Sequence, residues 1–258
     1  MSSVIASTAS RRLAQRGDLH THHGRLLRTR WVLAMTFVVS FFIPSFSWAG
    51  GTISGTVTYV GIPSLPKKTP ITLDNEVCGN IAVGEDLVLS KKGGIKNAVI
   101  FIQGSVPSAK PFPKEQSFSI DQKKCRFEPH VKIVPAGKDL LVTNSDGILH
   151  NFHTNGLTNP SLNKAQPKSL PQMIVKFLRP EIFSVVCDVH SWMKAWIVVA
   201  AHPYYTITDD EGKFQLTDVP AGDYTLRLWH ETLGEREKRV LVSEGESTKL
   251  EFKLHQED

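Results

Sequence analysis

Short apolar runs separated by turn residues fill the chain from residue 50 onward. Residues 51–60 (GTISGTVTYV) alternate, while 97–104 (NAVIFIQG) and 138–144 (KDLLVTN) are short runs that end in turn residues. The same pattern predicts further strands at 173–177, 182–187, 195–201, 212–219, 223–229, 238–242 and 248–254. No segment after residue 50 keeps an apolar stripe of helical period over ten residues. The pattern therefore predicts an all-β protein built as a sandwich or barrel, with its longest loop at 154–172.

The N-terminal segment has a different pattern. Six arginines and one acidic residue, Asp18, lie within residues 1–30, and the uncharged apolar run WVLAMTFVVSFFIP follows. Small residues then precede Gly50, which suits a signal-peptidase cut after Ala49. We predict that residues 1–49 are a signal peptide and that the protein is periplasmic or secreted. The alternative is an uncleaved anchor, because 19 uncharged positions at 31–49 approach the length of a span; membrane attachment is expected only in that case.

Removal of this segment changes the charge of the protein. The whole chain carries a formal charge of +5, and residues 1–49 carry +5 of it. The remaining residues hold 24 basic and 24 acidic side chains, so the mature protein is neutral by formal count. The high isoelectric point thus gives no reason to expect a nucleic-acid partner.

Three cysteines are present, which is an odd number for an exported protein. Two cysteines usually pair outside the cytoplasm, and the third then needs an explanation. Cys187 has other metal-binding residue types beside it in CDVHSWM, residues 187–193. We therefore expect the disulfide to join Cys78 and Cys125. The alternative is that Cys187 pairs and another cysteine is free.

The cluster at 187–193 combines a thiol, an imidazole and a thioether. Soft sulfur ligands together with imidazole favour copper over magnesium or calcium, and two histidines, one cysteine and a weak axial methionine form the blue-copper arrangement. A second histidine is available in ILHNFH, residues 148–153, after a turn at Asp146. Apart from Met193, the only methionine after residue 49 is Met173. An axial thioether thus has few candidates.

The order of these residues resembles the cupredoxins, in particular the amicyanin type with its short Cys-x2-His-x2-Met spacing. The resemblance covers roughly residues 116–201 and implies a Greek-key β-sandwich. It implies one mononuclear type 1 copper held by His150, Cys187, His190 and Met193, with Asn151 tying the ligand loop through hydrogen bonds. Val185 and Val186 stand where the family usually has an aromatic residue before the cysteine.

Three other roles for these residues are a zinc site, a catalytic Cys–His pair and ordinary structural histidines. A zinc site would need a fourth donor, and no second pair with zinc-ligand spacing is present. A catalytic Cys–His pair would need a base and an oxyanion hole, and would give Met193 no role. His153 lies three residues from His150 and should face the other side of a strand, so it is the weaker ligand candidate. The remaining histidines are expected to be surface residues or satisfied core residues: His130, His202, His230 and His255.

The C-terminal part resembles a second family. Residues 204–231 (YYTITDDEGKFQLTDVPAGDYTLRLWHE) are similar to the carboxypeptidase regulatory-like, or transthyretin-like, β-sandwich, in which the glycines and acidic residues make turns. The strand at 51–59 and the short strand at 97–102 have the form of that family's first segments. We therefore expect residues 50–104 and 203–258 to form one small sandwich split by a cupredoxin domain at 105–202. The alternative is two consecutive domains, with the N-terminal strands joining the copper domain.

Together these features predict an exported one-electron carrier that works between redox donor and acceptor proteins and is not an enzyme. His190, ringed by Trp192 and Trp196, is the expected exit for electrons at the surface. The alternatives are copper delivery or storage and, more remotely, a Cys–His thiol enzyme.

Overall fold

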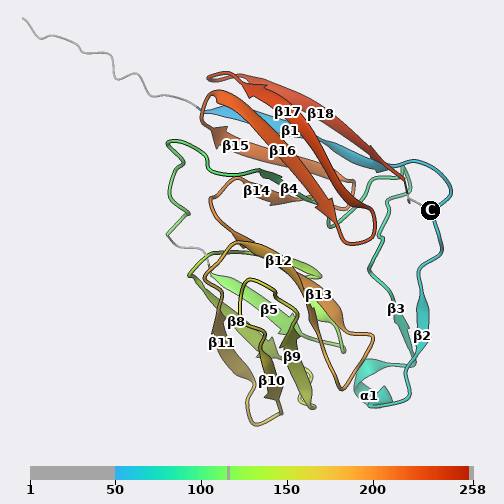
Figure 1. Cartoon of the computed structure of the whole chain (residues 1–258). Helices are drawn as coiled ribbons and strands as arrows, with labels where there is room; N and C mark the ends of the chain where they lie inside the picture. Colours follow the sequence, from blue (N-terminus) through green and yellow to red (C-terminus); the bar gives the residue numbers. More distant parts are fainter. Residues whose placement is uncertain (1–49, 115–116, 256–258) are drawn as a thin grey trace, which may run out of the picture. The chain divides into compact units, whose positions relative to one another are not determined.

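A computed structural model describes residues 50–114 and 117–255 (Figure 1). The predicted signal peptide and Ala49 lie outside the described residues. Within this part of the chain the protein is built from strands and one helical turn, so the predicted all-β class is confirmed. None of the described helices is long and apolar enough to cross a bilayer.

Two sheets, which we call the terminal sandwich, contain the first and last strands of the described chain. The first sheet has the order β15-β1-β18, with β15 (Lys213–Val219), β1 (Gly51–Tyr59) and β18 (Ser247–Leu254). The second has the order β14-β4-β16-β17, with β14 (Tyr205–Ile207), β4 (Val99–Ile102), β16 (Gly222–His230) and β17 (Gly234–Val242). Strands from both ends of the chain therefore share each sheet, with β1 and β4 in internal positions.

Gly55 allows β1 to lie between its two neighbours. A Cβ atom at this position would lie 2.1 Å from the carbonyl oxygen of Leu250 and 2.7 Å from the ring of Phe214. Only glycine fits a site where another backbone approaches this closely. The glycine in the middle of this first strand is thus required by packing.

Between β4 and β14 the chain forms a second pair of sheets, the inserted sandwich. Its larger sheet has the order β10-β9-β12-β13-β7, with β10 (Asn163–Gln166), β9 (His150–Thr154), β12 (Glu181–Val186), β13 (Lys194–Ala200) and β7 (Val131–Pro135). Its smaller sheet has the order β11-β8-β5-β6, with β11 (Gln172–Lys176), β8 (Asp139–Asn144), β5 (Phe118–Gln122) and β6 (Phe127–Glu128). The pairs β13–β7 and β5–β8 are parallel and the others are antiparallel.

A third element, the arm, is the segment 68–83 between β1 and β4. It consists of β2 (Lys68–Pro70), a single helical turn α1 (Asn75–Cys78) and β3 (Ile81–Val83). β2 and β3 pair only with each other among the described strands. Val77 and Cys78 of α1 pack against the core of the inserted sandwich. The arm therefore leaves one sandwich and covers part of the other (Figure 1).

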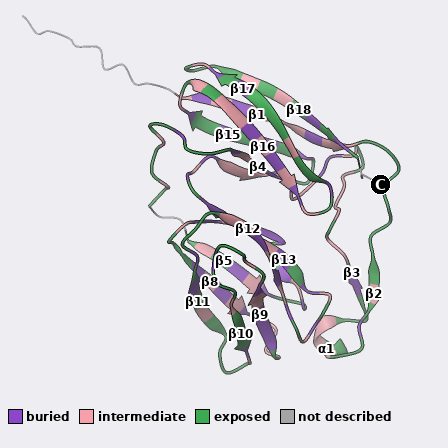
Figure 2. Ribbon diagram, viewed as in Figure 1, coloured by how far each residue is buried: buried purple, intermediate pink, exposed green. Residues whose placement is uncertain are grey.

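Each sandwich has its own apolar core, which Figure 2 shows as buried strand positions that alternate with exposed ones. Ile53, Ile100 and Leu228 lie in the core of the terminal sandwich, and Phe127 and Phe152 in that of the inserted sandwich. A third cluster, which includes Val99 and Val198, joins the two sandwiches. In both sandwiches the alternation of apolar and polar residues thus determines which face of most strands points to the core.

The predicted long loop at 154–172 is partly wrong, because it contains strand β10. This strand pairs with β9, with Asn163 opposite His153 and Gln166 opposite His150. Three of its four residues are exposed and all but one are polar, so an apolar pattern could not reveal it. Edge strands with a solvated face often lack that signal.

Candidate metal centre

The candidate ligands lie at one end of the inserted sandwich. His150 is the first residue of β9, and Cys187 begins the loop that joins β12 to β13. Two backbone hydrogen bonds close this loop: Met193 N–H donates to the carbonyl of His190 (2.9 Å), and Cys187 N–H donates to the carbonyl of Met193 (3.3 Å). Short spacing along the sequence thus becomes a tight turn that directs several side chains inward.

Three donor atoms converge inside this end of the sandwich. Sγ of Cys187 lies 3.9 Å from Nδ1 of His150 and 3.8 Å from Nδ1 of His190, and the two Nδ1 atoms are 2.9 Å apart. A triangle with these sides has a circumscribed radius of about 2.1 Å. Bonds from a comparable metal, zinc, to imidazole and thiolate are about 2.0–2.3 Å long. The three atoms therefore have the spacing of ligands around one metal ion.

The opposite nitrogen of each imidazole meets a carboxylate. Nε2 of His150 lies 2.9 Å from Oδ2 of Asp146, and Nε2 of His190 lies 3.0 Å from Oδ2 of Asp74. An ionised carboxylate can only accept, so each Nε2 carries the proton and each Nδ1 presents a lone pair. Metal-binding histidines commonly have such a carboxylate partner, which fixes the tautomer and the ring orientation.

The site chemistry fits a metal ion. His150 and His190 are both 0% exposed, and Cys187 is 2% exposed. Burial lowers the pKa of His150 below its ordinary value, although the hydrogen bond to Asp146 opposes this shift. This shift favours the neutral imidazole, which is the form that binds a metal. Two imidazole nitrogens and one cysteine sulfur at these distances can all bind one cation, so this donor set suits a metal ion.

The donor set also favours copper among the metals. Two imidazoles and one cysteine sulfur are the His2Cys donor set found in type 1 copper sites. Met193 follows in the same loop and is 1% exposed. The two other groups of potential ligand atoms in the described residues include Cys78 or Cys125. These two cysteines form a disulfide and cannot act as thiolate ligands.

Asn151 connects the two parts of the site. Its side-chain oxygen accepts a hydrogen bond from Asp188 N–H (2.5 Å), and its Nδ2 donates to Oδ2 of Asp188 (2.8 Å) and to Asn163 (2.7 Å). Asp188 directly follows Cys187 in the chain. The strand that carries His150 is thereby joined to the loop that carries the other ligands.

The packing behind Cys187 uses aromatic residues from other strands. Val185 is fully buried in the core cluster that also contains Cys187, Phe127 and Phe152. The two phenylalanine rings meet edge to face, with centroids 6.1 Å apart. The core near the cysteine therefore contains aromatic side chains even though a valine stands at position 185, because Phe127 of β6 and Phe152 of β9 lie in the same cluster.

His153 lies outside the converging trio. Its Nδ1 is 2.9 Å from Oδ1 of Asp188, and its side chain is 30% exposed. His130 and His202 are buried with hydrogen bonds to Glu231 and to backbone carbonyls, respectively. His230 is also buried, and its Nδ1 accepts from the backbone of Thr232 and Leu233. His255 is exposed.

The sequence-based expectation that His190 forms an exposed edge is wrong. The tip of the arm covers it, because Asp74 bonds to its outer nitrogen and the disulfide Cys78–Cys125 ties the arm down. Asp74 adopts a left-handed conformation, with φ of 54°. No local pattern could place Asp74 there, since 116 residues separate it from His190.

Only one of the two tryptophans predicted around His190 lies against it. The ring centroids of Trp192 and His190 are 5.2 Å apart. Trp196 instead packs on Trp229, with centroids 4.7 Å apart, and its indole N–H donates to Glu231 (2.7 Å). Trp196 lies on β13 in the cluster between the sandwiches, so its side chain is used in the contact with β16.

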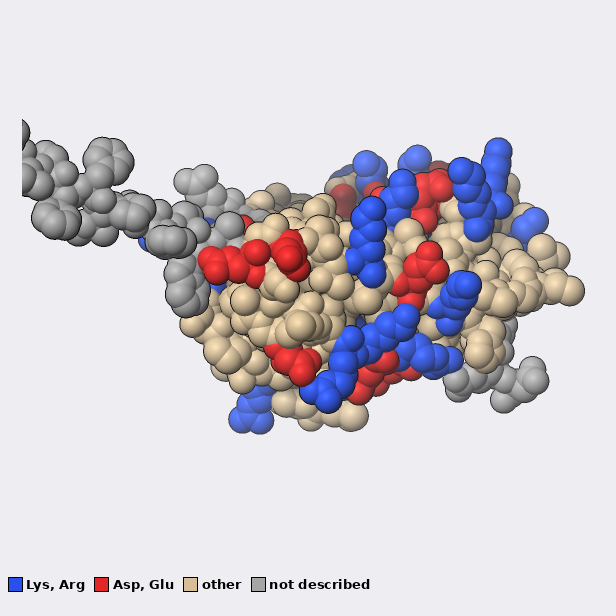
Figure 3. All heavy atoms as spheres, turned by 90° about the horizontal axis from the view of Figure 1, so that it is seen from above, with Lys and Arg blue, Asp and Glu red and all other residues tan. Residues whose placement is uncertain are grey.

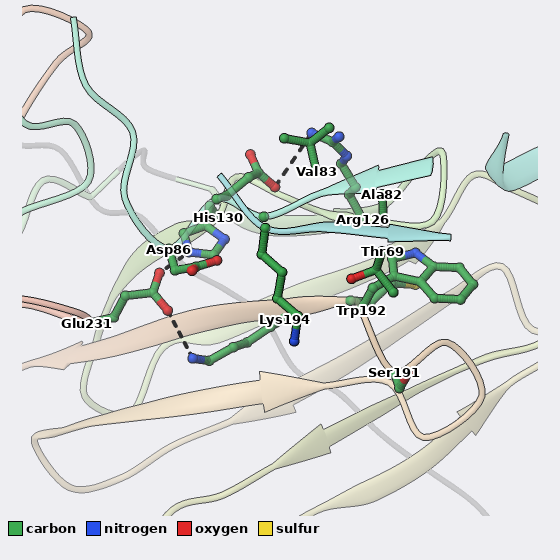
Figure 4. A pocket seen from close by; sticks show the side chains of 14 residues that line it. Thr69, Ala82, Val83, Asp86, Arg126, His130, Ser191, Trp192, Lys194 and Glu231 are labelled. Atoms are coloured by element: carbon green, nitrogen blue, oxygen red, sulfur yellow. Dashed lines mark hydrogen bonds and ion pairs between the residues drawn. The ribbon is translucent and has the colours of Figure 1, made fainter. Parts of the chain in front are cut away.

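A pocket of about 220 Å³ lies beside the ligand loop. The arm contributes Thr69, Ala82 and Val83 to its walls, and the loop contributes Ser191 and Trp192 (Figure 4). In this view the pair formed by His130 and Glu231 lies at the other side from Trp192, and Lys194 bonds to the same carboxylate at 3.0 Å.

Comparison with known families identifies the C-terminal part. Residues 194–255 match the model of the carboxypeptidase regulatory-like domain. The match confirms the predicted resemblance; it begins in β13 and does not include β1 or β4, which complete the two sheets of this regulatory-like sandwich. No curated protein matches the chain.

Solved structures similar to this chain include several copper proteins. A Cu-containing nitrite reductase (NirK) from Thermus scotoductus SA-01 is 18% identical, with a TM-score of 0.31 over 38% of this chain and 25% of the reductase. A variant of amicyanin is 20% identical, with a TM-score of 0.30 over 37% of this chain and 97% of amicyanin. A purple cupredoxin from Nitrosopumilus maritimus is 16% identical, with a TM-score of 0.28 over 33% of this chain and all of that protein. The matched part thus amounts to a quarter of the length of the reductase, and these likenesses concern the fold alone.

Proposed function

We propose that this protein is an exported one-electron carrier with one type 1 copper ion held by His150, Cys187, His190 and Met193. The observation that carries the proposal is the convergence of two imidazole nitrogens and one thiol on a single buried point. Copper bound there would exchange one electron between its two common oxidation states. We assign the protein no catalytic reaction.

The candidate ligands are suited to a carrier because hydrogen bonds from neighbouring side chains fix their positions. Asp146 and Asp74 fix the two imidazoles, and Asn151 joins the strand to the ligand loop. Asp146 is itself fixed, since its carboxylate accepts from the backbone N–H groups of Lys124 (2.5 Å) and Cys125 (2.8 Å). Ligands held by such outer contacts keep one geometry. Little then needs to move when an electron enters or leaves.

Visible absorption tests the proposal. The copper-loaded, oxidised protein should be intensely coloured, because charge transfer from the Cys187 thiolate requires that sulfur on Cu(II). Cys187→Ala and His150→Ala should each abolish the colour. His230→Asn is the matched control. This buried histidine lies in the terminal sandwich, so its substitution should leave the colour unchanged. A colourless wild-type protein would exclude the carrier and leave copper delivery, copper storage or a thiol enzyme.

The proposed partners are redox donor and acceptor proteins, and nucleic acid is not among them. The neutral charge of residues 50–258 supports this proposal. Figure 3 shows Lys and Arg interspersed with Asp and Glu on the face seen from above. Ion pairs on the terminal sandwich, such as Arg239–Asp223 at 2.7 Å, alternate the two signs. Binding to a nucleic-acid backbone depends on a surface dominated by positive charge.

We further propose export to the periplasm or beyond, with cleavage after Ala49. A disulfide between Cys78 and Cys125 supports an oxidising compartment. N-terminal sequencing of the protein from the periplasmic fraction should give a chain that starts at Gly50. A full-length chain found in the membrane fraction would instead support an uncleaved anchor.

A further inference from the structure

We propose that electrons pass between the copper site and redox partners through the indole of Trp192, which contacts His190, and that no partner reaches the imidazole of His190 directly. The proposal rests on the function proposed above and specifies the residue that a partner must approach.

His190 offers no surface to a partner. It is 0% exposed, and its Nε2 is occupied by Asp74 at 3.0 Å. The disulfide also covers this side, because the sulfur atoms of Cys78 and Cys125 and a ring nitrogen of His190 all lie within 4.8 Å of one another. A partner at the outside of the arm would be separated from the imidazole by the carboxylate and the disulfide.

Trp192 is the ligand-loop side chain that connects His190 to the surface. Its ring centroid lies 5.2 Å from that of His190, with an angle of 55° between the planes, so the two rings are in contact. The side chain is only half-buried, and it lines two separate pockets. One is the pocket of Figure 4, and the other is bordered by Ile71, Cys78 and Cys125 on the side of the disulfide.

The indole is held in this position. Its Nε1–H donates to the carbonyl of Cys125 (3.2 Å), which is one end of the disulfide. Its neighbour Met193 is held by the loop hydrogen bond to His190. The other tryptophan of this region, Trp196, packs on Trp229 and bonds to Glu231, and it makes no ring contact with His190 within the described part of the chain. Trp192 is therefore the aromatic side chain with both a ligand contact and an open face.

The electron transfer needs no bond to form or break. One electron leaves the reduced site for an external acceptor, and the acceptor is reduced by one electron. The indole is not itself oxidised to a stable product; it shortens the distance over which the electron must cross saturated or empty space. Electron tunnelling weakens steeply with that distance. Removal of the ring should therefore slow transfer without changing the ligand set.

Stopped-flow oxidation of the reduced, copper-loaded protein by hexacyanoferrate(III) tests this role. Trp192→Leu should lower the second-order rate constant by roughly tenfold or more, with the visible spectrum and the reduction potential unchanged. Trp192→Phe keeps an aromatic ring but loses the hydrogen bond to Cys125, and should retain the rate within about threefold. Trp196→Phe is the matched control and should behave as the wild type.

The outcomes separate this inference from the proposed function. A coloured Trp192→Leu protein that reacts at the wild-type rate would overturn the role of Trp192 and leave the carrier intact. A lower rate accompanied by an altered spectrum or potential would make Trp192 a support of the ligand loop and would also overturn the inference. A colourless wild-type protein would remove the carrier itself.

Discussion

The two sandwiches of this protein use the same kind of strand but bury different chemistry. The core of the terminal sandwich is made of aliphatic and aromatic side chains, among them Ile53, Phe214 and Leu226. Most buried polar residues of the described chain lie instead in the inserted sandwich, including Asn144, Gln166 and His190. Apolar burial is enough to hold a scaffold together. Buried polar groups cost free energy unless each finds a partner, so the inserted sandwich depends more on side-chain hydrogen bonds than the terminal sandwich does.

The polar groups of the inserted sandwich are paired almost completely. Nδ2 of Asn144 donates to the carbonyls of Ile148 and Gln166, both at 2.8 Å. Nε2 of Gln122 donates to Oε1 of Gln166 at 2.6 Å, while Oε1 of Gln122 and Nδ1 of His130 are buried without a hydrogen-bond partner in the described chain. These bonds lie around the chain segment that leads into His150. Hydrogen bonds of this kind between buried side chains and the backbone hold the surrounding chain rigidly.

The largest effect is expected from separating the two sandwiches. Residues 203–258 alone lack β1 and β4, which are internal strands of the first and second terminal sheets, so this fragment should not fold. Residues 105–202 contain every strand of the inserted sandwich and should fold and bind copper when Cys125→Ser removes the unpaired thiol. Urea unfolding followed by circular dichroism measures both. A cooperative transition of the fragment 203–258 would show that the regulatory-like part does not need the N-terminal strands.

Loss of the disulfide should have the next largest effect. The bridge spans 47 residues and ties the arm to the inserted sandwich. Cys78→Ser combined with Cys125→Ser should lower the free energy of unfolding by about 2–5 kcal/mol. The copper-loaded variant should keep its colour, because neither sulfur is a ligand. Colour loss in this double variant would mean that the arm is needed to hold the ligands themselves.

Acid should weaken the junction between the sandwiches. Burial raises the pKa of Glu231, but the hydrogen bond and charge of His130 oppose this and hold it at about 2, below the ordinary 4.5. Burial lowers the pKa of His230 from 6.5 to about 4. In both cases the unfolded chain binds more protons, so stability is full above the ordinary pKa and is lost as pH falls through the folded one. The windows are pH 6.5–4 for His230 and pH 4.5–2 for Glu231.

Each of these groups should contribute about 3 kcal/mol over its window. Urea unfolding at a series of pH values measures the slopes. Glu231→Gln should flatten the dependence below pH 4.5 and leave the slope between pH 6.5 and pH 4.5 in place. An unchanged slope in that variant would mean that Glu231 does not hold its low pKa in the folded protein.

The smallest effect is expected at the axial position. Met193→Leu should keep a coloured site with an altered reduction potential, because the axial ligand tunes the metal more than it holds it. Potentiometric titration measures the change. Met173→Leu is the control, since this partly buried methionine lies on β11 and not in the ligand loop, and should leave the potential unchanged. Equal potentials in the wild type and in Met193→Leu would remove Met193 from the ligand set.

Much of the fold could be predicted because alternation and turn residues are local signals. The ten strands predicted from the pattern appear as β1, β4, β8, β11, β12, β13, β15, β16, β17 and β18, within a few residues at each end. Among the strands that were missed are β10, which is mostly polar, and the two strands of the arm, which pair only with each other. Strands β5, β7 and β9 were also missed, although each is as long as β11. The arm is stabilised by the pairing of β2 with β3 and by a disulfide, so its own residues show little periodic pattern that predicts its structure.

The sequence by itself determined the all-β class, the regulatory-like motif and the short Cys-x2-His-x2-Met spacing. These follow from periodicity, from turn chemistry and from donors that lie within a few residues of one another. Only the tertiary structure brought Asp74 to His190, covered that imidazole and left Trp192 as its contact with the surface. The reason is the long separation of the contacting segments: a hydrogen bond across 116 residues depends on where the arm packs, and no local pattern encodes that placement.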